Sequence, residues 1–241
     1  MGFVSIHTPK LLASSSEGGS AVFRLDYEGQ PVCLAQSPQL HKQMAICGDL
    51  RRVFVVGPVF RAEDSFTHRH LCEFVGLDAE MEIYKDYSEF LEKTLRLTFE
   101  EGTQMLKEAG VEVDPLGDLN TESERKLGQL VLEKYKTEFY ILHRFPTAVR
   151  PFYTMPCADN PLYSNSFDVF IRGEEIMSGG QRVHVPEVLE KRARECGIDV
   201  RSASTRWIRS FGLERVVMLF CAQNNIRKTS LLPRDPQRLS P

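Results

Sequence analysis

The alternation of apolar and polar residues predicts two paired strands in the first third of the chain. Residues 51–60 (RRVFVVGPVF) are almost continuously apolar, as in a buried strand. A polar loop follows, and residues 73–83 (EFVGLDAEMEI) are predicted to form its antiparallel partner. In that partner Asp78, Glu80 and Glu82 alternate with apolar residues, so we expect the three carboxylates on one face.

Helix-end signals mark the segments around these strands. Ser37 and Pro38 predict a helix start, with the serine as N-cap and the proline in the first helical position. Gln39, Lys42 and Gln43 then share one face of this helix. Further helices are predicted over residues 98–109, from Thr121 to about Tyr135 after a capping box of Thr121 and Glu124, from Pro186, and from Gly212.

Strand character returns over residues 166–182, around a turn at 172–173 (RG). A two-residue turn places Asp168 opposite Met177 and puts Glu175 on the same face, with the two carboxylates about 7–8 Å apart at the backbone. Such carboxylates repel unless a positive charge lies between them. Magnesium is one candidate for that charge, and a pair of solvated surface acids is the equal alternative.

Strands joined by hairpins, with helices between them, predict an α+β domain built on an antiparallel β-sheet flanked by helices. Neither the glycine-rich pattern of a dinucleotide-binding βαβ unit nor that of a P-loop is present.

Composition narrows the class of protein. The chain has 241 residues, of which 42% are hydrophobic, and no apolar run approaches the roughly 20 residues that a membrane span needs. The six cysteines form no CxxC pair and no zinc spacing, which favours reduced thiols in a cytosolic protein. The net charge of −3 is unlike that of dedicated nucleic-acid binders, so contact with RNA would need a local basic patch or another domain.

Two arginines are candidates for anion binding. Arg61 ends the first apolar strand and precedes the donor-rich residues 67–70 (THRH), which form either a phosphate clamp or an exposed basic loop. Arg215 lies in the first turn of the last helix, where a cation is disfavoured. An anion docked at that end, or an ordinary salt bridge, would explain it.

Together these segments resemble the three motifs of the class II aminoacyl-tRNA synthetases. GFVSIHTPKL resembles motif 1 with its proline at Pro9, FRAED…THRHLCEF resembles motif 2, and GLERV resembles motif 3. The stretches SSSEGG, AQSPQLHKQ, RPFYTMP, RGEEIMSGGQR and TSLLPRDPQRLSP are similar to the archaeal and eukaryotic cytosolic aspartyl-tRNA synthetases. The resemblance covers nearly the whole chain, in order.

The resemblance implies a set of site residues. Those implied to contact ATP are Arg61, Glu63, His70, Phe74, Glu175 and Arg215. Those implied to contact aspartate are Ser16, Glu17, Gln39, Lys42, Asp78, Ser178 and Arg182. Asp168 and Glu175 would hold Mg²⁺.

The implied roles follow from charge. Arg61 and Arg215 would be the catalytic residues, because they would neutralise ATP phosphates, and Phe74 with Arg215 would sandwich the adenine. Ser16, Glu17 and the glycines that follow them would form a mobile lid over the amino acid. Lys42 and Arg182 would bind the aspartate side-chain carboxylate, which would separate aspartate from asparagine by charge.

The resemblance also implies partners and organisation. Residues 1–241 would be a catalytic domain, with the N-terminal anticodon-binding domain absent from the chain. The protein would be a cytoplasmic homodimer, joined through the motif 1 region, that uses L-aspartate, ATP and tRNA(Asp) and no membrane. The stretch near residues 90–95 and the one before Gly212 look shortened relative to the family.

Three alternatives stay open at this stage. They are an asparaginyl-tRNA synthetase, a synthetase-like asparagine synthetase that adenylates aspartate, and a non-catalytic paralogue.

Overall fold

The computed structural model describes residues 2–16, 21–62, 64, 70–84, 87, 94–197, 208–230, 233–235 and 237, and the backbone alone of residues 208–213. The chain divides into two compact units, Met1–Met81 with Ser210–Pro241, and Glu82–Arg209. Each unit is considered by itself. No helix among the described residues is long and apolar enough to cross a bilayer.

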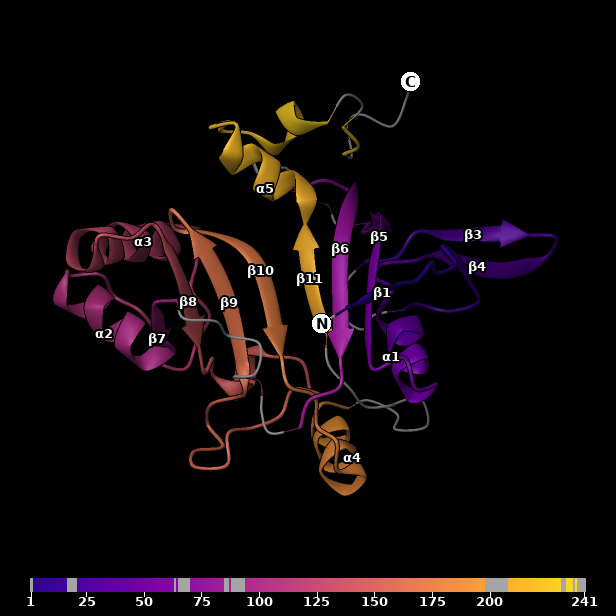
Figure 1. Ribbon diagram of the computed structural model, residues 1–241, viewed down its shortest axis with the longest axis horizontal. Helices are drawn as coiled ribbons and strands as arrows, with labels where there is room; N and C mark the ends of the chain where they lie inside the picture. Colours follow the sequence, from indigo (N-terminus) through magenta and orange to yellow (C-terminus); the bar gives the residue numbers. More distant parts are fainter. Residues whose placement is uncertain are drawn as a thin grey trace. The chain divides into compact units, whose positions relative to one another are not determined.

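The first unit is built around β5 (Arg52–Phe60) and β6 (Glu73–Met81), which pair antiparallel as predicted, with Val55 opposite Asp78. β1 (Val4–Ser5) lies parallel to β5, and β11 (Ile208–Gly212) follows β6 in the sheet (Figure 1). β6 ends at Met81, so Glu82 lies beyond the strand. The prediction that three carboxylates share one face of this strand was therefore wrong for Glu82.

Shorter elements complete this unit. They are β2 (Leu11–Leu12), β3 (Arg24–Tyr27) and β4 (Gln30–Leu34) in a separate three-stranded sheet, the helices α1 (Gln39–Cys47) and α5 (Leu213–Phe220), and a 3-10 helix over Ile226–Thr229. α1 contacts both β5 and β6, and α5 contacts β6.

The second unit contains four strands in the order β10-β9-β8-β7 and three helices (Figure 1). Its elements are β7 (Arg96–Thr98), α2 (Phe99–Glu108), α3 (Thr121–Tyr135), β8 (Phe139–His143), a 3-10 helix over Thr147–Val149, β9 (Ser166–Ile171), β10 (Glu174–Gly180) and α4 (Pro186–Glu195). α2 and α3 pack on the strands through a core that includes Leu106, Leu127, Tyr140, Phe145 and Phe170. β7 pairs with β8 in parallel, whereas β8, β9 and β10 pair antiparallel. Helices packed on a mainly antiparallel sheet confirm the α+β class.

The helix starts differ in detail from the sequence prediction. α1 has Pro38 as its N-cap, without a side-chain hydrogen bond, so the serine before it caps nothing. The N-cap of α3 is Asn120, whose Oδ1 accepts from the Ser123 N–H at 2.9 Å. The predicted capping box one residue later was therefore wrong. A complete capping box occurs instead at α2, between Thr98 and Glu101.

The hairpin turn at 172–173 is confirmed, because Arg172 and Gly173 have φ values of 56° and 74°, as a two-residue turn of left-handed residues requires. The register beyond it was predicted wrongly. A bulge between Glu175 and Met177 shifts the pairing, so that Ser178 and not Met177 lies opposite Asp168. A bulge adds one residue to one strand only, which parity counting from the turn does not reveal.

Candidate active site

In the first unit, Lys42 lies between two carboxylates. Its Nζ is 3.6 Å from Asp78 Oδ1 and 3.5 Å from Glu80 Oε2, and the three side chains are 0%, 1% and 0% exposed. The alternation along β6 places both acids on one face, and α1 directs the lysine towards them. Gln39, one turn earlier in α1, is also buried. A desolvated cluster of this kind holds its side chains in fixed positions.

A second lysine contributes to the charge of this cluster. Burial lowers the pKa of Lys10, and the negative charge of Asp78 opposes that shift. Lys42 and Lys10 therefore both interact with the Asp78 carboxylate, and Lys42 also pairs with Glu80. Glu80 and Lys10 are absent from the set of site residues implied by the sequence, although the alternation of β6 had pointed to Glu80.

Arg61 and Phe74 come together at the ends of β5 and β6. The Arg61 guanidinium carbon is 5.7 Å from the centroid of the Phe74 ring, within cation–π range. The Arg61 backbone N–H donates to the Cys72 carbonyl at 2.8 Å. His70 is partly exposed close by in the chain, while Glu63 and residues 65–69 lie outside the described part. A planar cation beside an aromatic face fits a nucleotide base and its phosphates.

Arg215 is positioned by its neighbour. Glu214 Oε1 accepts a hydrogen bond from the Val75 backbone N–H at 2.8 Å, which fastens the first turn of α5 to β6. An acid is favourable at a helix start because it complements the helix dipole. Met218 of α5 packs with Leu71 in a small apolar cluster. Sequence reasoning missed Glu214, whose partner comes from 139 residues away.

Ser16 is buried, and its hydroxyl oxygen accepts from the backbone N–H groups of Gln36 and Ser37 at 3.1 and 3.2 Å. It therefore ties the segment before the predicted lid to the approach of α1. Glu17, the other predicted lid residue, lies outside the described residues.

In the second unit, Asp168 forms an ion pair that the sequence did not predict. Arg150 Nη2 donates to Asp168 Oδ2 at 2.6 Å. Burial raises the pKa of Asp168 to about 7, against the Arg150 charge, and the charge of Glu175 raises it further. Glu175 therefore acts electrostatically on Asp168, as the hairpin had indicated.

The carboxylates of Asp168 and Glu175 suit a hard cation. Asp168 Oδ1 is buried, and no described residue donates a hydrogen bond to it. Such an orphaned oxygen is what a Mg²⁺ ligand would present. Within the described ranges no group of three or more acidic, histidine or cysteine side chains forms a metal cluster. Two carboxylates are enough where phosphate oxygens and water complete the magnesium shell.

Arg182 follows β10 and is 6% exposed. Its guanidinium carbon lies 4.1 Å from the Tyr153 ring centroid. The backbone on either side is fixed, because the Met155 N–H donates to the Gln181 carbonyl at 2.7 Å and the Val183 N–H to the Tyr153 carbonyl at 2.8 Å. Tyr153 lies in the stretch RPFYTMP that carries part of the resemblance, but the sequence did not predict its contact with Arg182.

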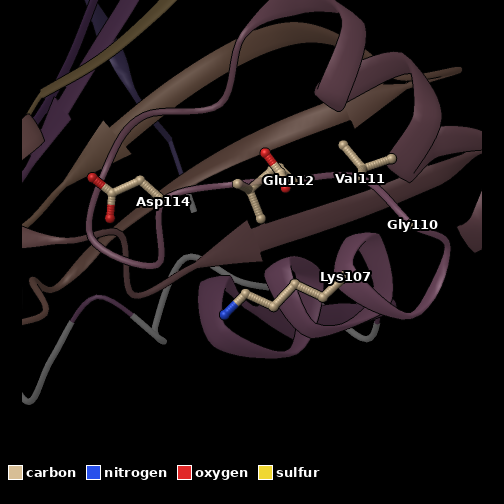
Figure 2. Close-up of a pocket in the computed structure, with 6 residues that line it drawn as sticks. Lys107, Gly110, Val111, Glu112 and Asp114 are labelled. Carbon is tan, nitrogen blue, oxygen red and sulfur yellow. The ribbon is translucent and has the colours of Figure 1, made fainter.

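A surface hollow of about 710 Å³ lies at the C-terminal end of α2 (Figure 2). It is lined by Lys107, Gly110, Val111, Glu112, Val113 and Asp114. None of the predicted site residues lines it.

Comparison with known proteins identifies the family. The model of the "tRNA synthetases class II (D, K and N)" matches residues 1–208. A relative named "Aspartate--tRNA ligase 2, cytoplasmic" from Arabidopsis thaliana is 73% identical, over 99% of this chain and 51% of its own length. The human "Aspartate--tRNA ligase, cytoplasmic" is 49% identical over the whole chain and 58% of its own length.

Solved structures agree. The aspartyl-tRNA synthetase of Entamoeba histolytica has a TM-score of 0.84 and 45% identity, over 99% of this chain and 55% of its own. The Pyrococcus horikoshii asparaginyl-tRNA synthetase complexed with asparaginyl-adenylate has a TM-score of 0.85 and 27% identity, over 100% of this chain and 65% of its own.

The chain spans about half the length of the curated relatives that it matches. The alignments to them run over 288 or 289 residues, more than the 241 of this chain, so the relatives contain residues without a counterpart here. The shortened stretches expected near residues 90–95 and before Gly212 stay predictions, since residues 88–93 and 198–207 lie outside the described part. From the matched family model and these relatives, which are named aspartate–tRNA ligases, the chain belongs to the class II tRNA synthetases of the D, K and N group.

Proposed function

We propose that this protein activates L-aspartate with ATP and transfers the aspartyl group to tRNA(Asp). The observation that carries the proposal is the buried set of charges around Lys42 in a chain that is 73% identical to an aspartate–tRNA ligase. A cation held beside carboxylates, without exposure to water, is able to select a ligand by charge.

The first unit would contribute the groups that hold the ammonium and the nucleotide. Asp78 and Gln39 would bind the aspartate α-amino end, with Lys42 opposite its side-chain carboxylate. Arg61, Phe74 and Arg215 would bind the adenine and the phosphates, with Glu63 and His70 as further ATP contacts. Phe74 supports this role because the Arg61 guanidinium already lies over its ring.

Arg182 and Ser178 would also bind aspartate, and Asp168 and Glu175 would hold Mg²⁺. When bound, Mg²⁺ would neutralise charge on the ATP phosphates. The α-carboxylate of aspartate is already ionised at neutral pH, so its attack on the α-phosphate requires no general base. The side chains therefore act by positioning the reactants and by neutralising charge.

The wider assignments rest on the same relatives. We infer a cytoplasmic protein, because the matched ligases are named cytoplasmic. We also infer a homodimer that forms through the motif 1 region. Phe3, Val4 and Leu11 support this interface, because all three are apolar and between 38% and 47% exposed.

Pyrophosphate exchange into ATP tests the proposal. Aspartate should stimulate exchange at least tenfold more than asparagine, because the neutral side-chain amide of asparagine would not form an ion pair with the cations of the site. Arg182→Ala should abolish this aspartate dependence while ATP binding persists. Lys191→Ala, at an exposed position of α4, is the matched control and should behave as wild type. Exchange with asparagine alone, or aspartate exchange in Arg182→Ala within a few-fold of wild type, would overturn the proposal.

A further inference from the structure

Arg150 is held between an aromatic ring and a carboxylate in the second unit. Its guanidinium carbon lies 3.9 Å from the centroid of the Phe145 ring, and its Nη2 donates to Asp168 Oδ2 at 2.6 Å. The arginine and aspartate side chains are 18% and 9% exposed. The two side chains therefore form a short ion pair that is largely shielded from solvent.

The ring beneath Arg150 is itself fixed. Phe145 is 2% exposed, belongs to the main core of the unit, and packs on Phe99 with ring centroids 5.0 Å apart. The backbone at Arg150 ends the 3-10 helix Thr147–Val149 and donates its N–H to the Thr147 carbonyl at 3.4 Å. Core packing therefore fixes the ring on which the guanidinium lies, and a hydrogen bond holds the Arg150 backbone.

The two carboxylate oxygens of Asp168 therefore differ in their hydrogen bonding. Oδ2 accepts from Arg150, whereas Oδ1 is buried and receives no hydrogen bond from the described residues. A buried carboxylate that is hydrogen-bonded through one oxygen is restricted in its rotation, so its second oxygen keeps a preferred direction. That arrangement suits a cation that takes one oxygen from each carboxylate.

We propose that Arg150 is a positioning residue: held on Phe145, it fixes the Asp168 carboxylate through Oδ2 so that Oδ1 is oriented towards the divalent cation that accompanies ATP. This inference rests on the proposed function, which makes Asp168 a metal ligand. It differs from a simple structural ion pair in its consequence, because a structural pair stabilises the fold without changing metal affinity. It also differs from simple competition, in which a nearby cation would weaken metal binding.

Mn²⁺ is a suitable probe, since the electron paramagnetic resonance signal of the free ion reports its binding in the presence of ATP once the binding to ATP alone has been subtracted. Arg150→Met keeps an apolar side chain over Phe145 and removes the hydrogen bond, and it should weaken Mn²⁺ binding at least tenfold. Arg150→Lys keeps the charge without the planar geometry and should give an intermediate loss. Arg144→Met is the control, because it breaks a pair of the same kind, 2.7 Å from Asp159, at a more exposed place. It should bind Mn²⁺ within twofold of wild type.

Tighter or unchanged Mn²⁺ binding in both Arg150 variants would overturn the proposal, and Arg150→Lys decides if the methionine variant does not fold. Asp168→Asn separates this outcome from failure of the proposed function. If Asp168→Asn binds Mn²⁺ as wild type does, the metal assignment is wrong and the role of Arg150 falls with it. If Asp168→Asn loses Mn²⁺ while the Arg150 variants do not, the metal site stands and only the inference about Arg150 is wrong.

Discussion

Lys42 and Glu80 form an ion pair of 3.5 Å in which neither side chain is exposed to solvent. The same lysine is 3.6 Å from Asp78, so removal of its charge would leave two buried carboxylates facing each other. Lys42→Met should lower the free energy of unfolding by about 3–5 kcal/mol, as is usual when one partner of a buried pair is lost.

Urea unfolding followed by circular dichroism measures this loss. Lys191→Met breaks an exposed i,i+4 contact with Glu195 in α4, and it should change the same free energy by less than about 0.5 kcal/mol. Equal effects of the two substitutions would contradict the buried cluster.

Gly128 of α3 fits against the hairpin turn because it has no side chain. A Cβ built there would lie 2.6 Å from Gly173 Cα, a backbone atom that cannot move aside. Gly128→Ala should therefore lower the thermal midpoint, by an amount equivalent to about 2–3 kcal/mol. Gly102→Ala in α2 is the comparison, since its Cβ meets the Leu142 side chain at 3.0 Å. That side chain can adjust, and alanine favours helix, so the change should stay below about 1 kcal/mol.

The environment of His143 leads us to expect that the free energy of unfolding depends on pH. Burial lowers its pKa below the ordinary value of 6.5, and the charges of Arg96 and Arg144 add to this. The unfolded chain then binds the proton more readily than the folded one, so stability should fall as the pH drops below about 6.5. Tyr87 Oη is 2.8 Å from His143 Nδ1, and the imidazole tautomer determines which of the two atoms donates the hydrogen bond.

The measurement is the unfolding free energy at pH 7.5 and pH 5.5 for wild type and His143→Gln. The wild type should lose more stability between these values than the glutamine variant does. A wild-type loss equal to that of the variant would show that His143 does not titrate differently in the folded state.

We expect substitution of Tyr153 to affect the binding of aspartate selectively. Its ring lies 4.1 Å from the Arg182 guanidinium carbon, a contact worth about 1–2 kcal/mol when desolvated. Tyr153→Leu should raise the KM for aspartate in pyrophosphate exchange by roughly 5- to 30-fold, with the KM for ATP unchanged. Tyr153→Phe keeps the ring and should resemble wild type. An equal rise of both KM values in Tyr153→Leu would instead indicate general damage to the fold.

Several features of this protein follow from the sequence alone. The alternation over residues 73–83 placed Asp78 and Glu80 on one face, because side chains in a strand point to opposite sides in turn. The pair 172–173 specified a tight turn, since glycine readily adopts positive φ. The three motifs indicated the family, because each motif is a run of neighbouring residues that can be read directly along the chain.

Tertiary structure decided what depends on residues far apart in the chain. The Lys42 cluster needs α1 to pack on β6, and Glu214 reaches Val75 across 139 positions. The bulge in β10 set Ser178 opposite Asp168 through local backbone geometry that leaves no mark on hydrophobic alternation. Arg150 begins the stretch RPFYTMP, but the sequence assigned it no partner, and only the packing of Phe145 and β9 brings it to Asp168. A linear pattern records which residues share an element, whereas ion pairs and ring contacts between elements arise from three-dimensional packing.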